Sequence, residues 1–315
     1  MAGRLLSNVS ESPSFVDEPL KIGACNHSWV DAPLVTMERR AHAAFVQCVR
    51  RWHLSRPLLV TSIDRKFLPF IKRWQARAQS FGWRQQLILA LDAATAQEIS
   101  NRSACVVPYH PYEGLQFLHR TSHRMPAWTG LSKFHALEWA LAAGFAVLYS
   151  EQDIYWFRDP LPLLPWTAEH NDVHAQTGDD AAAMQHSRHT LNIGFLFVRP
   201  NDRSLGCVRS FVSLWRDRLT CNYRQGTKAG LDQYYFNQVC VKRICRCAKL
   251  EPRRRFPLAI TSAGSVFGAT ADPQEALRHV VSDDASPVIL HLNGVNHTLR
   301  AALLEALYLA SPGTE

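Results

Sequence analysis

The sequence has no apolar run of about 18 residues, which is the length that a helix needs to cross a membrane. Its first 30 residues hold Arg4, Leu5 and Leu6 and then mostly polar and acidic residues, which does not match a signal peptide. We therefore expect no signal and no transmembrane anchor in this chain. Membrane association is expected only if an anchor is missing from it.

Two glycine-rich phosphate-binding motifs are also absent. Neither G-x-G-x-x-G nor G-x-x-x-x-G-K-[ST] follows the first predicted strand, residues 58–60. Their absence argues against a dinucleotide-binding oxidoreductase and against a P-loop enzyme. It also argues against a nucleotidyltransferase that makes nucleotide-sugars, because that class usually carries a glycine-rich loop at this place.

The cysteines lack the spacing of a zinc site. Cys240, Cys245 and Cys247 are the tightest group of the eight, and they contain no C-x-x-C pair. Disulfides are the alternative if the chain enters an oxidising compartment. N-glycosylation sequons begin at Asn8, Asn26, Asn101 and Asn296. They are compatible with glycosylation in the secretory pathway, but such tripeptides also arise by chance.

The charge is basic but dispersed. The net charge is +8, and no long basic run is interleaved with aromatic residues. We therefore expect no nucleic-acid partner. The positive excess suits an anionic ligand such as a nucleotide-sugar, although most of these side chains are expected on the solvated surface.

The first half of the chain alternates short apolar segments with helical patterns. Strands are predicted over 58–60, 87–91 and 105–107, with helices over 67–81 and 95–100 between them. This alternation is typical of a doubly wound α/β sheet with right-handed crossovers. We expect residues 57–310 to form one catalytic domain. Residues 1–56 are predicted to be an N-terminal extension, loose to about residue 35, with an accessory helix over 37–52.

Two carboxylates follow a predicted strand, residues 145–149, whose uninterrupted apolar run suits burial on both faces of the sheet. Side chains alternate along a strand, so Glu151 and Asp153 are expected to point the same way. Paired acids at the carboxyl edge of such a sheet, where ligands bind, need a cation or donors. Hard oxygen ligands suit Mg²⁺ or Mn²⁺ holding a diphosphate. The alternative, two solvated acids at a strand end, is weakened by the apolar residues 154–157 that follow.

Residues 147–160, V-L-Y-S-E-Q-D-I-Y-W-F-R-D-P, resemble a known signature. They are similar to V-L-x-S-D-x-D-x-x-W-x-x-D-P of the nucleotide-diphospho-sugar transferases of glycosyltransferase family 77, with Glu151 where Asp is commoner. Three more motifs extend the resemblance over about residues 57–305: L-N-I-G-F-L-F-V-R-P at 191–200, L-D-Q-Y-Y-F-N at 231–237 and H-L-N-G at 291–294. The resemblance implies a GT-A fold, with a doubly wound mixed sheet and a Rossmann-like nucleotide-binding half.

The resemblance also implies roles for single residues. The metal ligands would be Asp153, His291 and, with less certainty of direct ligation, Glu151. The residues near the donor would be Thr61, Ser62, Asp92, Lys133, Asn192 and Gly194. The residues beside the transferred sugar, assigned as catalytic, would be Asp232 and Gln233.

Several of these residues have a structural alternative. Thr61 and Ser62 could cap a helix, Asn192 could satisfy backbone groups, and Asp232 could be a helix cap. Lys133 is predicted in the first turn of a helix that Ser132 caps. Because the helix dipole disfavours a cation there, an anionic partner is expected.

We therefore expect a glycosyltransferase that uses Mn²⁺ or Mg²⁺ and a nucleotide-sugar donor, with UDP the commonest nucleotide in the family. The resemblance implies retention of configuration, a glycan or glycoprotein acceptor and the Golgi or another secretory-pathway lumen. No nucleophile for a covalent intermediate stands out in the sequence. The alternative is a nucleotide-sugar or carbohydrate binding protein without catalysis. Two departures from the family motifs leave this alternative open: Glu151 stands where the family commonly has Asp, and Ile193 stands where it has Thr.

Overall fold

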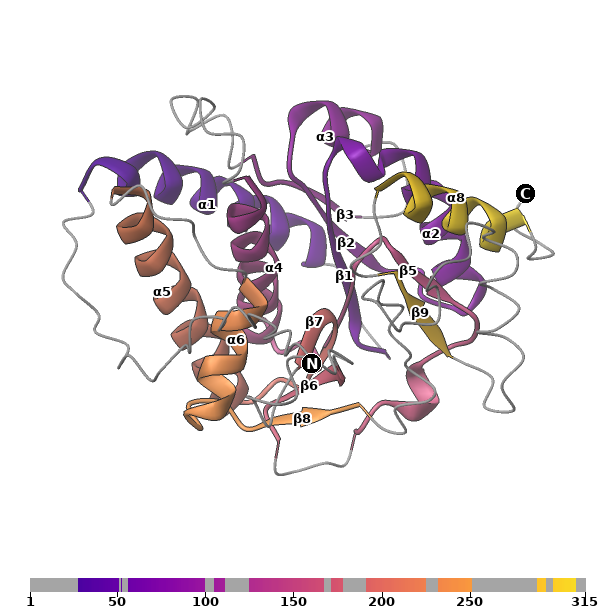
Figure 1. Cartoon of the computed structure of the whole chain (residues 1–315). Helices are drawn as coiled ribbons and strands as arrows, with labels where there is room; N and C mark the ends of the chain where they lie inside the picture. Colours follow the sequence, from indigo (N-terminus) through magenta and orange to yellow (C-terminus); the bar gives the residue numbers. More distant parts are fainter. Residues whose placement is uncertain are drawn as a thin grey trace, which may run out of the picture.

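The structure is a computed structural model, and its elements are labelled as in Figure 1. It describes residues 28–50, 52, 56–99, 105–110, 125–166, 171–177, 191–224, 232–250, 288–292 and 297–309. The asparagines of the four sequons lie outside the described residues. None of the helices in the described part is long and apolar enough to span a membrane.

A mixed seven-stranded sheet forms the centre of the molecule. Its strands, in spatial order, are β3 (Cys105–Pro108), β2 (Gln86–Ala90), β1 (Leu58–Ile63), β4 (Val147–Ser150), β7 (Leu191–Val198), β6 (Val173–Thr177) and β8 (Cys247–Lys249). The first four strands are parallel, β7 runs antiparallel to both of its neighbours, and β8 is parallel to β6. The sequence predicts β1, β2 and β3 because each contains a short apolar run. All residues of β1 and β2 are buried, and in β3 Cys105 and Val107 are buried.

Helices cover both faces of this sheet (Figure 1). One face carries α1 (Ser28–Val49), α4 (Met125–Ala142), α5 (Asp202–Arg224) and α6 (Asp232–Val241), and the other carries α2 (Leu68–Ser80) and α3 (Ala93–Ile99), with α8 (His297–Leu309) packed beside α2. Strand side chains alternate between the two resulting cores: Leu58 and Val60 belong to the first, and Leu59 to the second. The expected doubly wound α/β architecture is confirmed.

A second, two-stranded sheet lies beside the main one. It pairs β5 (Ile154–Trp156) antiparallel with β9 (Ile289–His291). The sequence predicts the segment 288–290 as the last strand of the domain, and the structure confirms a strand there but places it against β5. The apolar side of α8 covers this small sheet, with Leu303 and Leu304 in a core cluster that includes Tyr155.

The N-terminal helix begins earlier than the pattern predicts. It runs from Ser28 to Val49 rather than over 37–52. Its buried side chains Ala41, Phe45 and Val49 belong to the same core cluster as the strands of the main sheet. A disulfide from Cys48 to Cys105 ties the end of this helix to β3. The boundary at residue 56 stays a prediction.

The disulfide of α1 gives a first testable prediction. It joins residues 57 apart, whereas Cys240–Cys247 joins residues 7 apart. Loop-closure entropy predicts that removing the long-range bridge with Cys48→Ala and Cys105→Ala lowers the free energy of unfolding by about 4 kcal/mol. The matched pair Cys240→Ala and Cys247→Ala should cost about 2 kcal/mol. Denaturant titrations of both double variants check this, and an equal or reversed order would contradict it.

Candidate active site

The two acids lie in a tight turn, and strand alternation is the wrong explanation for their convergence. Strand β4 ends at Ser150, and the chain turns through 151–153 before β5 begins. The backbone N–H of Glu151 donates to the carbonyl of Gly194, 2.9 Å away, which fixes the turn against β7. Both carboxylates therefore face the same space because the chain reverses there.

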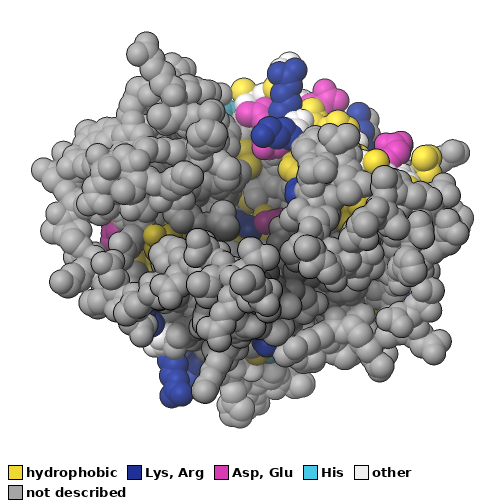
Figure 2. Space-filling model, viewed as in Figure 1, with side chains coloured by type: hydrophobic (Ala, Val, Ile, Leu, Met, Phe, Trp, Pro, Cys, Tyr) yellow, Lys and Arg dark blue, Asp and Glu magenta, His cyan; other side chains and the backbone are white. Residues whose placement is uncertain are grey.

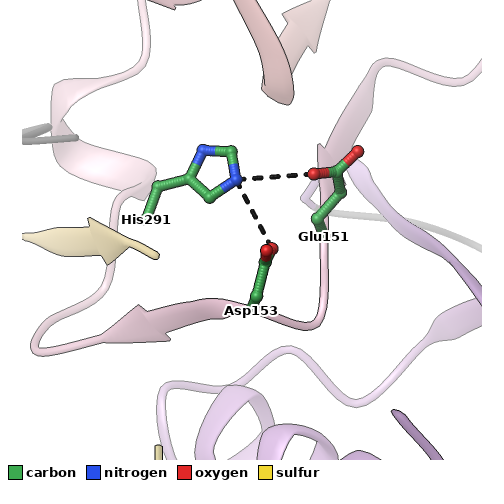
Figure 3. A group of neighbouring side chains, drawn as sticks. All are labelled: Glu151, Asp153 and His291. Carbon is green, nitrogen blue, oxygen red and sulfur yellow. Dashed lines mark ion pairs between the residues drawn. The ribbon is translucent and has the colours of Figure 1, made fainter. Parts of the chain in front are cut away.

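Pairing between β5 and β9 brings His291 to this turn. Ile154 pairs directly with His291, and the N–H of Leu292 donates to the carbonyl of Asp153 at 3.0 Å. Figure 3 shows the imidazole of His291 facing both carboxylates. The structure thus confirms that Glu151, Asp153 and His291 form one cluster.

The geometry of the cluster fits a divalent cation. His291 Nε2 lies 3.4 Å from Glu151 Oε2 and 3.4 Å from Asp153 Oδ1, and the candidate ligand atoms all lie within 4.8 Å of one another. Asp153 Oδ1 and His291 Nε2 are buried and have no hydrogen-bond partner among the described residues. Buried polar atoms of this kind are rare, and a metal ion would satisfy both. Carboxylate oxygens suit both Mn²⁺ and Mg²⁺, and an imidazole ligand favours the softer Mn²⁺.

Gln176 on β6 orients the imidazole. Its Oε1 lies 2.9 Å from His291 Nδ1, and the side chain is fully buried. An amide oxygen can only accept, so Nδ1 carries a proton and Nε2 is the nitrogen that faces the acids and would bind a metal after losing its own proton. Such partners of a ligating histidine fix its tautomer and ring orientation. Sequence reasoning missed Gln176, because a single Gln in a short strand has no recognisable pattern.

Removing this acceptor should weaken metal binding without unfolding the protein. Gln176→Leu keeps the volume but leaves Nδ1 without its partner, so we expect Mn²⁺ affinity to fall 10–100-fold. Gln176→Glu restores an acceptor and should retain most of the affinity. Calorimetric titration of Mn²⁺ into the three proteins tests this. Equal affinities for wild type and Gln176→Leu would contradict the orienting role.

Lys133 has the anionic partner that the sequence predicts, but it is not in a first helical turn. Helix α4 begins at Met125, with Pro126 in its first turn, so Ser132 is buried in the helix interior and is not the cap. Lys133 Nζ donates to Glu151 Oε1 at 2.7 Å and to the carbonyl of Ile193 at 3.3 Å. The ammonium therefore holds Glu151 with Oε2 toward His291.

A second cation, Arg300, enters the site from α8. Its Nη1 lies 3.0 Å from Asp153 Oδ2, and its side chain is 20% exposed toward the pocket. Sequence reasoning missed this residue as well. Its place depends on the fold of the last helix against β5, which no local pattern specifies.

The charges around His291 determine its protonation. Burial lowers the pKa of His291, but Asp153 and Glu151 outweigh it and raise the pKa to about 9. Burial raises the pKa of Glu151, while Lys133 and His291 together hold it well below its ordinary value. The Glu151 carboxylate is thus ionised, and without a metal the His291 imidazole carries a positive charge beside it.

Because Gly194 has no side chain, the imidazole of His291 can lie directly against β7. A Cβ added to this residue would lie 2.2 Å from His291 Cε1 and 2.8 Å from Glu151 Oε2. The sequence predicts that glycine here permits a close approach. In the structure, the groups that approach it are side chains of the acid–histidine cluster.

The cluster opens into a pocket of about 260 Å³. Figure 2 shows a central hollow with basic and acidic side chains on its floor. The pocket is lined by Ser62, Asp64, Phe67, Leu91, Gly130, Lys133, Tyr149, Glu151, Gln152, Asp153 and Arg300. It therefore lies at the carboxyl ends of β1 and β4, where ligands of α/β sheets bind.

The residues predicted near the nucleotide lie around this edge. Ser62 Oγ pairs with the Tyr149 hydroxyl at 2.9 Å, and Thr61 Oγ1 accepts from Gln152 Nε2 at 3.0 Å. The alternative that Thr61 and Ser62 are helix caps is wrong, because Asp64 caps the following turn. Asp92 accepts from the backbone of Thr95 and of Arg65, so it holds the start of α3 and the end of β1 together.

The residues predicted near the sugar are less closely grouped. Asn192 Oδ1 accepts from the N–H of Gly194 at 2.8 Å, which is the backbone role that was its alternative. Asp232 begins α6, and Gln233 follows it half-buried. Helix α6 contributes none of the described lining residues of the pocket. Sugar contacts by these three residues stay predictions.

Other positions of the motif support the turn. Trp156 is buried, donates from Nε1 to Ser150 Oγ at 3.1 Å and packs edge-on against Trp83. Asp159 accepts from Trp83 Nε1 and pairs with Arg56 at 2.9 Å. Trp156 and Asp159 thus have structural roles: they stabilise the segment that follows the acid turn.

Comparison with solved structures agrees with this architecture. The galactosyltransferase LgtC, in complex with donor and acceptor sugar analogues, is 13% identical, with a TM-score of 0.50 over 81% of this chain and 96% of that one. An active-site mutant of LgtC is 12% identical, with a TM-score of 0.48 over 79% of this chain and 95% of that one. The glycosyltransferase GlyE of Streptococcus pneumoniae TIGR4 is 10% identical, with a TM-score of 0.44 over 82% of this chain and 61% of that one. A comparison with curated protein sequences gives no match.

The family is identified from sequence. Residues 82–299 match the nucleotide-diphospho-sugar transferase family, a span that includes the acid turn, the Gly194 strand and His291. The mixed α/β sheet is that of GT-A glycosyltransferases. The chain belongs to the nucleotide-diphospho-sugar transferase family.

Proposed function

We propose that this protein is a metal-dependent glycosyltransferase that moves a sugar from a nucleoside-diphosphate donor to a glycan or glycoprotein acceptor. The observation that carries the proposal is a pair of buried atoms, Asp153 Oδ1 and His291 Nε2, which make no hydrogen bond among the described residues and lie 3.4 Å apart beside Glu151. A bound Mn²⁺ or Mg²⁺ would neutralise charge on the departing diphosphate.

The protein's own residues would prepare the site for that charge. Asp153, His291 and Glu151 hold the cation, Gln176 sets the imidazole tautomer, and Lys133 fixes the Glu151 carboxylate. Arg300 lines the same pocket beside Asp153, and its planar guanidinium offers several donors to phosphate oxygens. With a divalent cation, the cluster and these two cations would carry a net positive charge toward an incoming anion.

The finer assignments rest on the family resemblance. We propose UDP as the nucleotide, bound near Thr61, Ser62 and Asp92, and transfer with retention of configuration. We propose that Asn192 contacts a sugar hydroxyl and that Asp232 and Gln233 orient the sugar. The three disulfides of the described part, which include Cys207–Cys245, support a secretory-pathway lumen such as the Golgi.

A donor screen tests the proposed function. The protein is incubated with Mn²⁺ and a panel of UDP-, GDP- and CMP-sugars, and release of free nucleotide is followed with and without a chelator. We expect one UDP-sugar to be turned over and the chelator to stop the reaction. Binding of a nucleotide-sugar without turnover would favour the alternative, a non-catalytic binding protein. Turnover that the chelator leaves unchanged would contradict metal dependence.

A further inference from the structure

A larger pocket, of about 750 Å³, lies at the opposite edge of the sheet. Its lining includes residues 144–146, which precede β4, and residues 199–203, which follow β7. These segments flank the amino end of β4 and the carboxyl end of its antiparallel neighbour. The acid–histidine cluster follows the other end of β4, so a ligand in this pocket would not occupy the donor site.

One wall of this second pocket is an exposed indole. Trp166 is 41% exposed, whereas Trp74, Trp83, Trp156 and Trp215 are buried. Its ring stands edge-on to Phe197 with centroids 5.2 Å apart, and Arg199 Nη1 donates to its carbonyl at 2.8 Å. Phe197 and the bond from Trp166 Nε1 to the Leu161 carbonyl (3.4 Å) hold the indole in place, while part of its surface stays open to solvent. Such a surface stacks well against the apolar face of a ring, as at binding interfaces rich in Trp.

The polar groups around Trp166 offer both donors and acceptors. Arg56, Arg199 and Arg203 line the pocket as cations, and the exposed Asp202 supplies carboxylate acceptors. Arg56 is paired with Asp159 and Arg203 with Asp172, and Arg199 and Asp202 are opposite charges within the lining. The three arginines are thus matched by three aspartates, and the side chain of Arg203 is 44% exposed.

A phosphate is a poor fit for the same pocket. Helix α5 starts there, but the side chain of Asn201 already accepts from the backbone N–H of Ser204 at 2.8 Å. Asp202, the first residue of the helix, adds a negative charge where a bound anion would lie. A ligand rich in hydroxyl groups with an apolar ring face matches this site better than an anion does.

We propose that this pocket is a second, non-catalytic binding site for a neutral oligosaccharide that stacks on Trp166. Binding there requires neither a donor nor a metal. It would bind a glycan to the protein at the edge of the sheet opposite to the catalytic pocket. The inference is independent of the proposed transferase reaction, because no residue of the acid–histidine cluster takes part.

Saturation-transfer NMR on the full chain tests this site. The probes are cellohexaose, xylohexaose, mannohexaose and chitohexaose, with hexagalacturonate as an acidic counterpart. We expect at least one neutral hexaose to bind, and Trp166→Ala to weaken that binding at least tenfold. Trp166→Phe keeps an aromatic wall against Phe197 and should stay within a few-fold of wild type. Ile244→Ala, which removes a similarly exposed apolar side chain elsewhere, should have no effect.

The catalytic variant Asp153→Asn separates the two sites. Binding at the Trp166 pocket should be unchanged in it, with or without Mn²⁺. The proposal is overturned if none of the neutral hexaoses binds, or if binding survives Trp166→Ala and is lost in Asp153→Asn, which would place the sugar in the catalytic pocket. Binding of hexagalacturonate alone, abolished by salt, would overturn the choice of a neutral ligand.

Discussion

Asp153→Asn should reduce turnover of the nucleotide-sugar about a thousandfold, because metal stabilisation of a departing diphosphate is worth several kcal/mol. The substitution removes the charge that faces His291 Nε2, and it replaces one ligand oxygen with an amide group. Mn²⁺ binding by calorimetry should be lost together with activity. The fold should be retained, since Asn has nearly the same volume and Arg300 is partly exposed and can turn to solvent.

A matched control is available on the same helix as Arg300. Glu305 forms an ion pair with Arg73 at 3.0 Å, but it is 51% exposed and lies outside the pocket. Glu305→Gln should leave both activity and Mn²⁺ affinity unchanged, because an exposed ion pair contributes little. Full activity in Asp153→Asn, with its fold intact by circular dichroism, would refute the metal-ligand role.

The parts of the fold that the sequence predicts are those set by local pattern. Strands β1, β2 and β3 and the helices between them are visible because apolar runs and helical spacing alternate there. The ends of two helices are marked by Gly82 and Gly144, whose φ values of +87° and +83° are ones that glycine adopts readily. The start of α4 was missed, because an apolar segment without a capping residue has no clear boundary.

The parts of the site that could not be predicted depend on long-range packing. The motif identifies Glu151 and Asp153, and the H-x-N-G segment identifies His291. Neither shows that β9 pairs with β5, and this pairing is what brings His291 within 3.4 Å of both acids. Arg300 and Gln176 come from elements that meet the cluster only in the folded chain, and in the sequence each is an ordinary polar residue.

Gly194→Ala should impair the site through geometry alone, without changing any charge. The new methyl group would lie 2.2 Å from His291 Cε1, a distance that forces the imidazole to move. A displacement of about 1 Å at a catalytic group can cost about a hundredfold in rate, and Mn²⁺ affinity should fall with it. Overpacking should also lower the free energy of unfolding by about 1–3 kcal/mol.

Gly206→Ala is the matched control for this substitution. Gly206 lies in α5, and an added Cβ there meets nothing within 4 Å. Alanine in a helix interior should stabilise the protein by about 0.5–1 kcal/mol and leave activity and Mn²⁺ affinity unchanged. If Gly194→Ala behaved like Gly206→Ala in both assays, the close approach of His291 and Glu151 to β7 could not be what positions the cluster. We expect only Gly194→Ala to lose metal affinity, while both variants still unfold cooperatively. That result would show that the site needs the space that glycine leaves at position 194.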